Sequence, residues 1–425
     1  MSSYQSILDE LAELPVLDTH EHLPNEEERV AQEVDFTTLF SHYCRDDLIA
    51  AGMSEQHQDI IYGSASVAEK WQLMEPLLLA TGTSGYMRAA YLAMDRFYGM
   101  KSLRSLQDAE LLTERVKAAN KPGLYNRVLR DVCHIRRSMN YVGGPVDREF
   151  FEHVLNIGAY TTIGHMQDII ACEKAWDRSL PTLQRYEQAL LDHLQTLAEG
   201  GLKGFKIGQA YMRPLDFTAT TQHEAEQVFN RIFNESKPSN NRSLGYQESK
   251  PLEDYLTRRV IELAGDLQLP VVIHVGFQTF RNMKLDDARP HRLWELIRRY
   301  RSVRFSMLHG GLPWVEEGAV MARQLPNLSI DMGWMHIMCP EMAINALKYY
   351  FDMVPMHKVM GFGGDYQVVE KVYGHLQIAR QNIAIALAER MDRQQMSLEQ
   401  ARRWCRALVH DSANSFFQLQ LSPIE

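Results

Sequence analysis

The sequence predicts an α/β fold, a TIM-type (β/α)8 barrel that carries a helical insertion after its first strand. Short apolar runs alternate along the chain with longer helical patterns, and about eight such runs can be counted. Polar residues stand at the carboxyl ends of widely separated runs, where barrel enzymes build their active sites. A doubly wound open sheet is the alternative, but no GxGxxG motif opens a helix after the first strand.

The first predicted strand, residues 16–23, contains two histidines separated by one residue. Because side chains alternate along a strand, Asp18, His20 and His22 are expected to share one face. Two imidazoles on one face can bind the same metal ion. The alternative is a strand end with two incidental histidines, but later strands that also end in His or Asp favour a metal site.

Helical patterns lie on both sides of this strand. Residues 4–14 predict a short helix, which Pro15 closes just before the strand. The charged residues 24–29 predict a polar loop. Residues 36–120 repeat apolar side chains at helical spacing without strand-like alternation, so we expect a helical insertion there. Residues 1–425 are then a single barrel domain with this insertion inside it.

Beyond the insertion, strands and helices alternate. Further strands are predicted at residues 132–142, 154–163, 202–208, 270–276, 303–311, 328–332 and 358–365. Helices are predicted at residues 183–197, 256–267, 293–300, 315–324 and 341–350, and two more begin near Val369 and Leu398. Arg136 and Arg137 are expected in a basic loop at the second strand. Residues 217–250 form a long polar excursion, which predicts either a lid or a surface loop.

Composition and charge exclude several classes of protein. The 425 residues are 45% hydrophobic and 23% charged, as in ordinary globular proteins, and the net charge is −9. No run of lysines and arginines stands out, so no nucleic-acid partner is expected. No stretch approaches the length of an apolar membrane span, so no membrane partner is expected. The five scattered cysteines favour a reducing cytoplasm, and a homo-oligomer is left open.

Six residues of the metal-ligand and acid–base type stand where predicted strands end: His20, His22, Lys206, His274, His309 and Asp365. A single strand-end histidine is weak evidence, because such residues are more often structural. In a barrel, however, the carboxyl ends of all strands meet at one pocket. Imidazole and carboxylate groups suit Zn²⁺, and also Mn²⁺ or Fe²⁺. Three or four such ligands leave a position for water, whose proton Asp365 can accept.

This pattern resembles the amidohydrolase superfamily, in which His-x-His ends strand 1, His follows at strands 5 and 6, and Asp ends strand 8. Residues 18–22, Asp-Thr-His-Glu-His, match the first element, and residues 364–365, Gly-Asp, match the last. His274 and His309 fall at the two middle elements, and the tail at residues 411–417 is similar to the family's ending. The resemblance implies one metal site with the ligands His20, His22, His274 and Asp365.

The resemblance also implies roles for other strand-end residues. His309 would orient water or polarise the substrate, while Asp365 would accept the proton. In some members the lysine of strand 4 is carboxylated and bridges two metal ions. The Gly-Phe-Lys-Ile setting of Lys206 looks more like the branch that binds one ion and keeps this lysine near the substrate. We therefore expect one divalent ion, zinc before manganese or iron, and a second ion only if Lys206 is carboxylated.

Three functional hypotheses follow from the resemblance. The first is a metal-dependent hydrolase that cleaves a small amide, ester or lactone with metal-activated water. The second is a non-hydrolytic member, either a uronate-type isomerase or a carboxylate decarboxylase or lyase. Residues 70–76 and 96–99, together with Tyr86, resemble the helical segment of uronate isomerases. The third and remote hypothesis is a non-catalytic barrel that binds a metal.

Basic residues near predicted strand ends indicate a small anionic substrate. Lys206 stands at the fourth strand, and Tyr211 and Arg213 follow on a loop, where an arginine fork can hold a carboxylate. Arg213 could equally form a surface ion pair. Arg136 and Arg137 add positive charge near the second strand. Trp334, which follows the seventh strand, is expected to form a wall of the substrate pocket.

Overall fold

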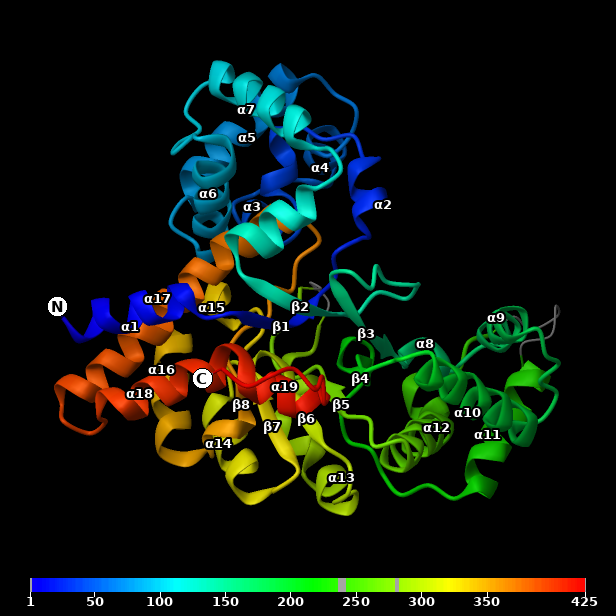
Figure 1. Cartoon of the computed structure of the whole chain (residues 1–425). Helices are drawn as coiled ribbons and strands as arrows, with labels where there is room; N and C mark the ends of the chain where they lie inside the picture. The colour runs from blue at the N-terminus through cyan, green and yellow to red at the C-terminus, as the bar shows by residue number, and fades with distance from the viewer. Residues whose placement is uncertain (1, 236–241, 280–282, 425) are drawn as a thin grey trace. The chain divides into compact units, whose positions relative to one another are not determined.

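The computed structural model describes residues 2–235, 242–279 and 283–424 (Figure 1). The strands are β1 (Val16–Glu21), β2 (Ile135–Asn140), β3 (Phe151–Asn156), β4 (Gly204–Ile207), β5 (Val271–Ile273), β6 (Phe305–Met307), β7 (Leu328–Asp331) and β8 (Val359–Met360). They follow one another in the sheet in chain order, and the pairs whose register is described are parallel. This arrangement is the (β/α)8 TIM barrel, so the predicted fold class is confirmed.

The chain divides into two compact units. Unit 1 comprises Met1–Glu152, Asp331–Ser415 and Gln420–Glu425, and unit 2 comprises His153–Ile330 and Phe416–Leu419. Unit 1 therefore contains β1, β2 and β8, while unit 2 contains β4, β5, β6 and most of β3 and β7. The strands of unit 2 are buried apolar runs such as Val271–Ile273, as parallel strands covered on both faces require.

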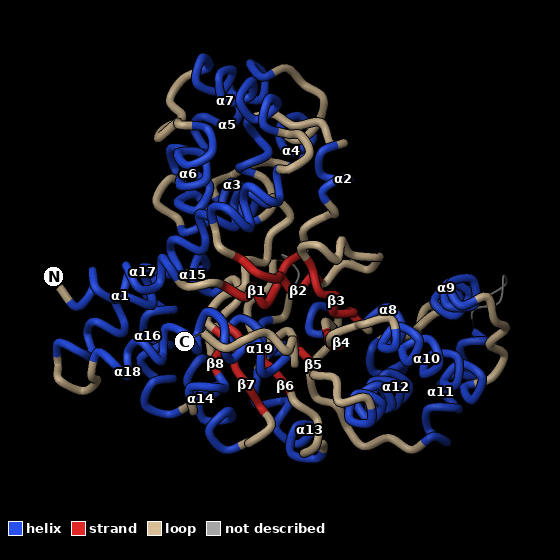
Figure 2. The backbone as a smooth tube through the Cα atoms, in the orientation of Figure 1, coloured by secondary structure: helices blue, strands red, loops and turns tan. Residues whose placement is uncertain are grey.

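The helices of unit 1 lie before β2 and after β7, and Figure 2 draws helices as blue tube. They are α1 (Ser3–Glu13), α2 (Glu26–Val30), η1 (Phe36–Phe40), α3 (Tyr43–Ala50), α4 (Glu55–Ile61), α5 (Val67–Thr81), α6 (Gly85–Tyr98), α7 (Leu106–Ala119), η2 (Asn126–Val132), α15 (Met335–Met338), α16 (Pro340–Met353), η7 (Met356–Lys358), α17 (Val369–Asp392), α18 (Leu398–Arg406), η8 (Ala407–Asp411) and α19 (Ser412–Phe417), the last of which ends in unit 2. Helices η1 to α7 occupy the segment for which the insertion was predicted.

Local sequence signals set the ends of the insertion helices. Ser66 Oγ accepts a hydrogen bond from Glu69 N–H at the start of α5, and the Glu69 carboxylate accepts one from Ser66 N–H. This reciprocal pair satisfies backbone donors that have no partner inside the helix. Helix α6 begins at the Ser84 cap and ends at Gly99, whose φ of 63° closes the helix in the left-handed conformation.

The helices of unit 2 are α8 (Gly158–Thr161), α9 (Met166–Trp176), α10 (Leu183–Glu199), η3 (Gln209–Tyr211), α11 (Gln222–Glu235), α12 (Tyr246–Asp266), η4 (Leu285–Ala288), η5 (Pro290–Leu293), α13 (Trp294–Arg299), η6 (Leu308–Gly311) and α14 (Val315–Gln324). The prediction of a loop or lid over residues 217–250 was wrong for much of its length. Helix α11 fills residues 222–235, where Ala225, Phe229 and Ile232 form a buried stripe at helical spacing. The turn-forming run at residues 238–241 lies outside the described residues.

Two further sequence predictions need correction. Residues 24–29 do not form only a polar loop, because α2 begins at Glu26 and buries Arg29 against Glu370, with an Nη2–Oε1 distance of 3.1 Å. Arg136 and Arg137 lie within the first half of β2 and not in a loop. They therefore stand away from the carboxyl end of that strand. In the described part of the chain, no helix is both long and apolar enough to cross a membrane.

Candidate metal centre

Three of the predicted metal ligands come together where β1 ends and the segment after β8 begins. His20 Nε2 lies 3.3 Å from His22 Nε2, and each of these nitrogens lies 3.6 Å from Asp365 Oδ1. In a tetrahedral zinc site with bonds of about 2.0–2.1 Å, the ligand atoms stand roughly 3.3–3.4 Å apart. The three donors therefore fit a divalent ion of this size. Among the described residues, this is the one group of three or more His, Cys, Asp and Glu side chains placed closely enough to share an ion.

Neighbouring groups fix the orientation of the cluster. The Tyr141 ring stacks on the fully buried His20 ring at a centroid distance of 3.9 Å, and its hydroxyl donates to Thr19 O. Asp365 N–H donates to His20 O at 2.6 Å, and Asp365 adopts a φ of 59°. Aspartate is one of the few residues that tolerates this left-handed conformation. The backbone of β1 thus holds the turn that presents Asp365 to the two histidines.

Three further carboxyl groups are fully buried near the cluster: those of Asp18, Glu21 and Asp331. Burial raises the pKa of Asp18 to about 6 and that of Asp331 to about 7. Burial, together with the charge of Asp18, raises the pKa of Glu21 well above its usual range. Among the described residues, none of the three forms an ion pair with lysine or arginine, so this part of unit 1 has an excess of acid groups that a cation would offset.

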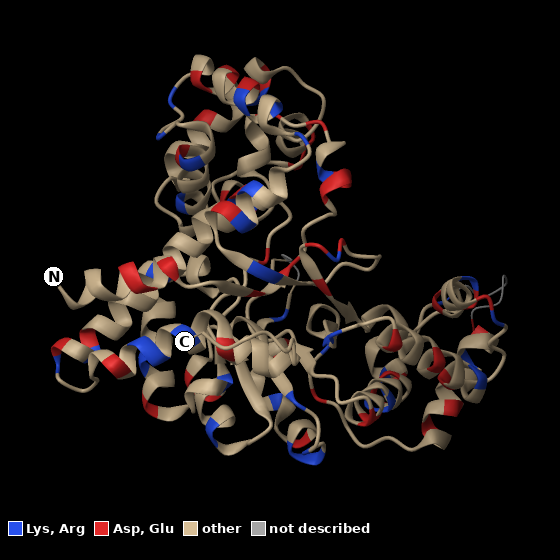
Figure 3. Cartoon of the chain, viewed as in Figure 1, with Lys and Arg blue, Asp and Glu red and all other residues tan. Residues whose placement is uncertain are grey.

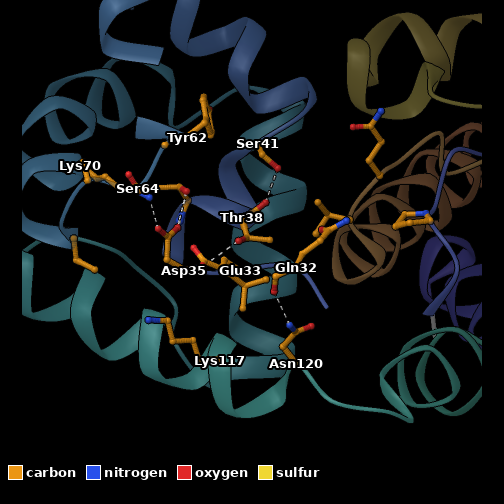
Figure 4. Close-up of a pocket in the computed structure, with 18 of the residues that line it drawn as sticks. Gln32, Glu33, Asp35, Thr38, Ser41, Tyr62, Ser64, Lys70, Lys117 and Asn120 are labelled. Carbon is orange, nitrogen blue, oxygen red and sulfur yellow. Dashed lines mark hydrogen bonds and ion pairs between the residues drawn. The ribbon is translucent and has the colours of Figure 1, made fainter. Parts of the chain in front are cut away.

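A large cavity of about 1090 Å³ opens beside the cluster within unit 1. Its wall includes His22, whose side chain is 32% exposed, together with residues of the helical insertion. Figure 4 shows the Lys70–Asp35 ion pair in this wall, with an Nζ–Oδ2 distance of 2.6 Å. Lys117 also lines the cavity, and among the described residues it has no ion-pair partner. A small molecule in this cavity can therefore reach the exposed edge of His22.

The predicted site residues of unit 2 gather around a second pair of histidines. His309 Nε2 lies 3.2 Å from His274 Nδ1, and His274 Nε2 lies 3.0 Å from Phe277 O. The Tyr211 ring lies 4.5 Å from the His274 ring, measured between centroids. Lys206 is on β4 and is buried. The roles assigned to these residues, including His274 as a fourth ligand, stay predictions.

Two substrate-binding candidates have partners within the protein. Arg213 is buried, and its guanidinium donates to Glu253 at 3.1 Å and to Asp254 at 2.5 Å. This geometry supports the ion-pair alternative, although the pair is buried and not at the surface. Trp334 is also buried, and it stacks on Tyr43 at a centroid distance of 4.6 Å. Trp334 thus belongs to the aromatic packing of unit 1.

Sequence reasoning missed three residues of this region. Asp331 ends β7 just as histidines end other strands, so its position could have identified it. Glu21 was overlooked because strand alternation places it opposite the histidines. His42 gave no sequence signal, yet its backbone is strained at φ 55° and its buried Nδ1 has no described hydrogen-bond partner. Burial and the nearby Lys371 lower the pKa of His42 to about 3, so its imidazole is neutral.

Comparisons with known proteins agree with this arrangement. The family model described as Amidohydrolase matches residues 186–406. Protein fluG of Emericella nidulans is 23% identical over 265 residues, which cover 60% of this chain and 29% of fluG. The chain therefore spans less than a third of that relative's length.

Two solved structures resemble the chain over nearly its whole length. One is the uronate isomerase of Thermotoga maritima, with a TM-score of 0.80 and 14% identity over 98% of this chain and 97% of that one. The other is the glucuronate isomerase of Caulobacter crescentus, with a TM-score of 0.79 and 16% identity over 99% and 95%. At these identities the likeness shows a shared fold.

Proposed function

The chain belongs to the amidohydrolase family, and on that premise we propose that it is a metal-dependent hydrolase of a small amide, ester or lactone. The observation that carries the proposal is the convergence of His20 Nε2, His22 Nε2 and Asp365 Oδ1 at mutual distances of 3.3–3.6 Å. Three ligands of this kind are typical of catalytic zinc sites, which keep a position for water or substrate.

The residues of the cluster have distinct roles in this proposal. His20, His22 and Asp365 would hold the ion, which would supply Lewis acidity for a water molecule or a substrate oxygen. Asp365 accepts the proton of the attacking water, since it is a carboxylate beside the reacting atoms. Tyr141 keeps the His20 ring in place by stacking on it. His22, which lines the cavity, marks the side from which the substrate approaches.

The size of the cavity supports a small substrate, and the carboxylate of that substrate is carried over from the sequence as part of the proposal. A volume of about 1090 Å³ is enough for a ligand of several hundred daltons, because such ligands occupy pockets of roughly 300–1,000 Å³. Lys117 provides a cation in the cavity wall that has no ion-pair partner among the described residues, but Glu28 and Glu33 also line this wall. No charge for the substrate is taken from Arg213, because Glu253 and Asp254 pair with it. None is taken from Arg136 and Arg137 either, because they lie in the first half of β2.

A second candidate is the isomerisation of a sugar acid. It is favoured by the likeness to two uronate isomerases, which extends over 98–99% of the chain and so includes the helical insertion. The same ligand set would serve this reaction. Asp365 would then transfer a proton to or from a carbon atom of the substrate instead of accepting one from water. The two candidates differ in one measurable respect, which is whether oxygen from water enters the product.

The first experiment measures metal content and its dependence on the cluster. We expect the purified protein to bind about one zinc ion per chain, and His22→Ala to lose it. His223→Ala is the matched control, because His223 is an exposed histidine on α11 that bonds only to Gln227 among the described contacts. Elemental analysis that finds no metal, with no activation by added Zn²⁺ or Mn²⁺, contradicts the proposal. A value near two ions would instead indicate a carboxylated Lys206.

The second experiment identifies the reaction. Zinc-loaded protein is incubated with lactones, amides and uronic acids in ¹⁸O-labelled water, and the products are weighed by mass spectrometry. Hydrolysis adds the mass of one labelled water to a lactone, or divides an amide into two products with the label in the acid. Turnover of a uronic acid without a change of mass identifies the isomerase instead.

A further inference from the structure

The acidic residue between the two histidines has an unexpected environment. Strand alternation predicts that Glu21 points away from Asp18, but the register of β1 is irregular between these residues. Both carboxyl groups are fully buried, and they hydrogen-bond to each other. Asp18 also accepts hydrogen bonds from the Ser138 side chain and from His20 N–H, the latter at 3.1 Å. The two carboxyls thus form a hydrogen-bonded pair inside unit 1.

The outer oxygens of this pair bind the turn that carries Asp365. Asp18 Oδ1 accepts a hydrogen bond from Gly364 N–H at 3.0 Å, and Glu21 Oε2 accepts one from Tyr366 N–H at 2.8 Å. Between them, Asp365 N–H donates to His20 O at 2.6 Å. Three consecutive peptide N–H groups are therefore all accepted by β1, and two of the three acceptors are the paired carboxyls.

This anchoring matters because the Asp365 backbone is strained. A φ of 59° is less favourable than the ordinary range even for aspartate, which tolerates it better than most residues, so contacts that hold it contribute to the geometry. Gly364 also shows how tightly the pair packs, since a side chain on this residue would overlap Glu21 Oε1. The hydrogen bonds on each side of Asp365 hold the backbone from which its carboxylate reaches His20 and His22.

We propose that the hydrogen-bonded pair of Asp18 and Glu21 is a positioning element that fixes the Asp365 turn in the geometry that binds the metal. The inference rests on the proposed function, because it assumes that the cluster binds a divalent ion. Glu21 acts here through the shape and hydrogen bonds of its side chain and not through its charge. It contacts neither the ion nor the substrate.

Two substitutions of Glu21 separate shape from charge. Glu21→Gln removes the charge but keeps the length, so its amide can donate to Asp18 Oδ2 and its oxygen can accept from Tyr366 N–H. Glu21→Asp keeps the charge but is too short to reach both partners. We expect Glu21→Gln to bind zinc within about 3-fold of the wild type. We expect Glu21→Asp to bind it about 10–100-fold more weakly, as is usual when a group that supports a metal ligand is lost.

The measurement is the zinc dissociation constant from equilibrium dialysis against a competing chelator at one fixed pH, with circular dichroism to confirm the folded state. Thr19→Val is the matched control, because Thr19 lies on β1 like Glu21. Its Oγ1 bonds to Asp331 and Phe362 O and not to Gly364 N–H or Tyr366 N–H. It should leave zinc affinity nearly unchanged. If Glu21→Asp does not fold, Gly364→Ala tests the same element by displacing the Glu21 carboxyl, and it should also weaken binding.

The outcomes distinguish this inference from the proposed function. If the wild type binds no divalent ion, both are wrong. If the wild type binds zinc but Glu21→Asp and Gly364→Ala bind it equally well, only the positioning role is wrong. If Glu21→Gln weakens binding as much as Glu21→Asp does, the charge of Glu21 matters and the positioning role is again overturned.

Discussion

Buried charge is arranged in opposite ways around Arg213 in unit 2 and around the histidine cluster in unit 1, although unit 1 also contains the buried Arg29–Glu370 ion pair. In unit 2, buried Arg213 contacts Glu253 and Asp254, and Lys250 adds a second cation at Asp254. In unit 1, the buried carboxyls of Asp18, Glu21 and Asp331 have no lysine or arginine partner among the described residues. Ion pairs also join the helices of unit 2 to one another, as between Arg259 of α12 and Glu187 of α10, and Figure 3 shows both charge types along these helices.

This difference teaches how to separate structural charges from functional ones. A buried charge with a complete set of partners belongs to the folded structure, and removing one partner leaves the others uncompensated. A buried acid without a cation must keep a proton or receive a cation from outside the chain. The cluster at His20, His22 and Asp365 lies among acids of the second kind. The next three predictions test this comparison.

The largest expected effect is that of Asp365→Asn on turnover. Asparagine tolerates the left-handed backbone at this position and keeps the shape of the side chain, so the fold should be retained. It cannot accept a proton, and loss of a general base costs about 10²–10⁴ in rate. The measurement is kcat at full zinc occupancy. A variant that keeps more than about a tenth of the wild-type kcat would show that another group is the base.

His309→Asn provides the comparison for that variant. His309 is predicted to orient water or substrate and is not one of the three clustered donors, so its loss should reduce kcat less than the loss of Asp365 does. If the two variants lose activity equally, the assignment of the base to Asp365 fails.

The second prediction concerns Arg213→Ala, which should affect stability and not catalysis. Breaking a buried ion pair by removing one partner typically costs about 3–5 kcal/mol. We expect a loss of this size in the free energy of unfolding, measured by urea denaturation, with zinc affinity and KM unchanged. Arg178→Ala is the control, because its pair with Asp192 is exposed, with about half of the arginine side chain accessible. An increased KM without a loss of stability would restore the substrate role predicted for Arg213.

The third and smallest effect is on the pH dependence of stability without metal. Burial raises the pKa of Asp331 from 3.8 to about 7, so the folded state keeps a proton that the unfolded chain has lost. Stability must therefore fall as pH rises from about 4 to about 7, by at most about 1.4 kcal/mol per pH unit for this group. The midpoint of thermal unfolding of the metal-free protein should be higher at pH 5 than at pH 8.

Asp331→Asn is the matched variant for this measurement. It should reduce the slope between pH 5 and pH 8, while part of the slope remains because Asp18 titrates in the same direction. A wild-type protein that is more stable at pH 8 than at pH 5 would contradict the excess of buried acid in unit 1. An unchanged slope in Asp331→Asn would assign the effect to other groups.

Much of the fold could be predicted from the sequence, because the spacing of apolar residues and the residues that end helices and strands are local properties. The helix at residues 315–324 has the bounds that its pattern predicted, and every predicted strand contains or overlaps a strand of the barrel. His20, His22 and Asp365 could be identified because each stands in or shortly after the last residues of a strand, where topology brings such residues together. The metal-ligand role of this set was suggested by the family resemblance.

The remaining features depend on contacts that no local pattern encodes. The hydrogen bond between Asp18 and Glu21 requires a strand irregularity that alternation does not reveal. The burial of Arg213 is decided by carboxylates on α12, about forty residues later in the chain. The positive φ of His42 likewise has no local signal in the sequence. Sequence patterns therefore located the candidate ligands but not the residues that contact them.

The close packing of α6 has a consequence for how this protein can diversify. A side chain at Gly85 of α6 would overlap Ile337 O of α15, and one at Gly374 of α17 would overlap Ala89 O of α6. Helix α6 thus packs backbone to backbone on α15 and α17, and α17 begins four residues after Asp365. Helix α6 belongs to the insertion, so the insertion is linked through α17 to the turn that carries Asp365. New specificities can therefore arise by exchanging side chains that face the cavity, whereas grafting a different insertion would disturb the candidate metal centre itself.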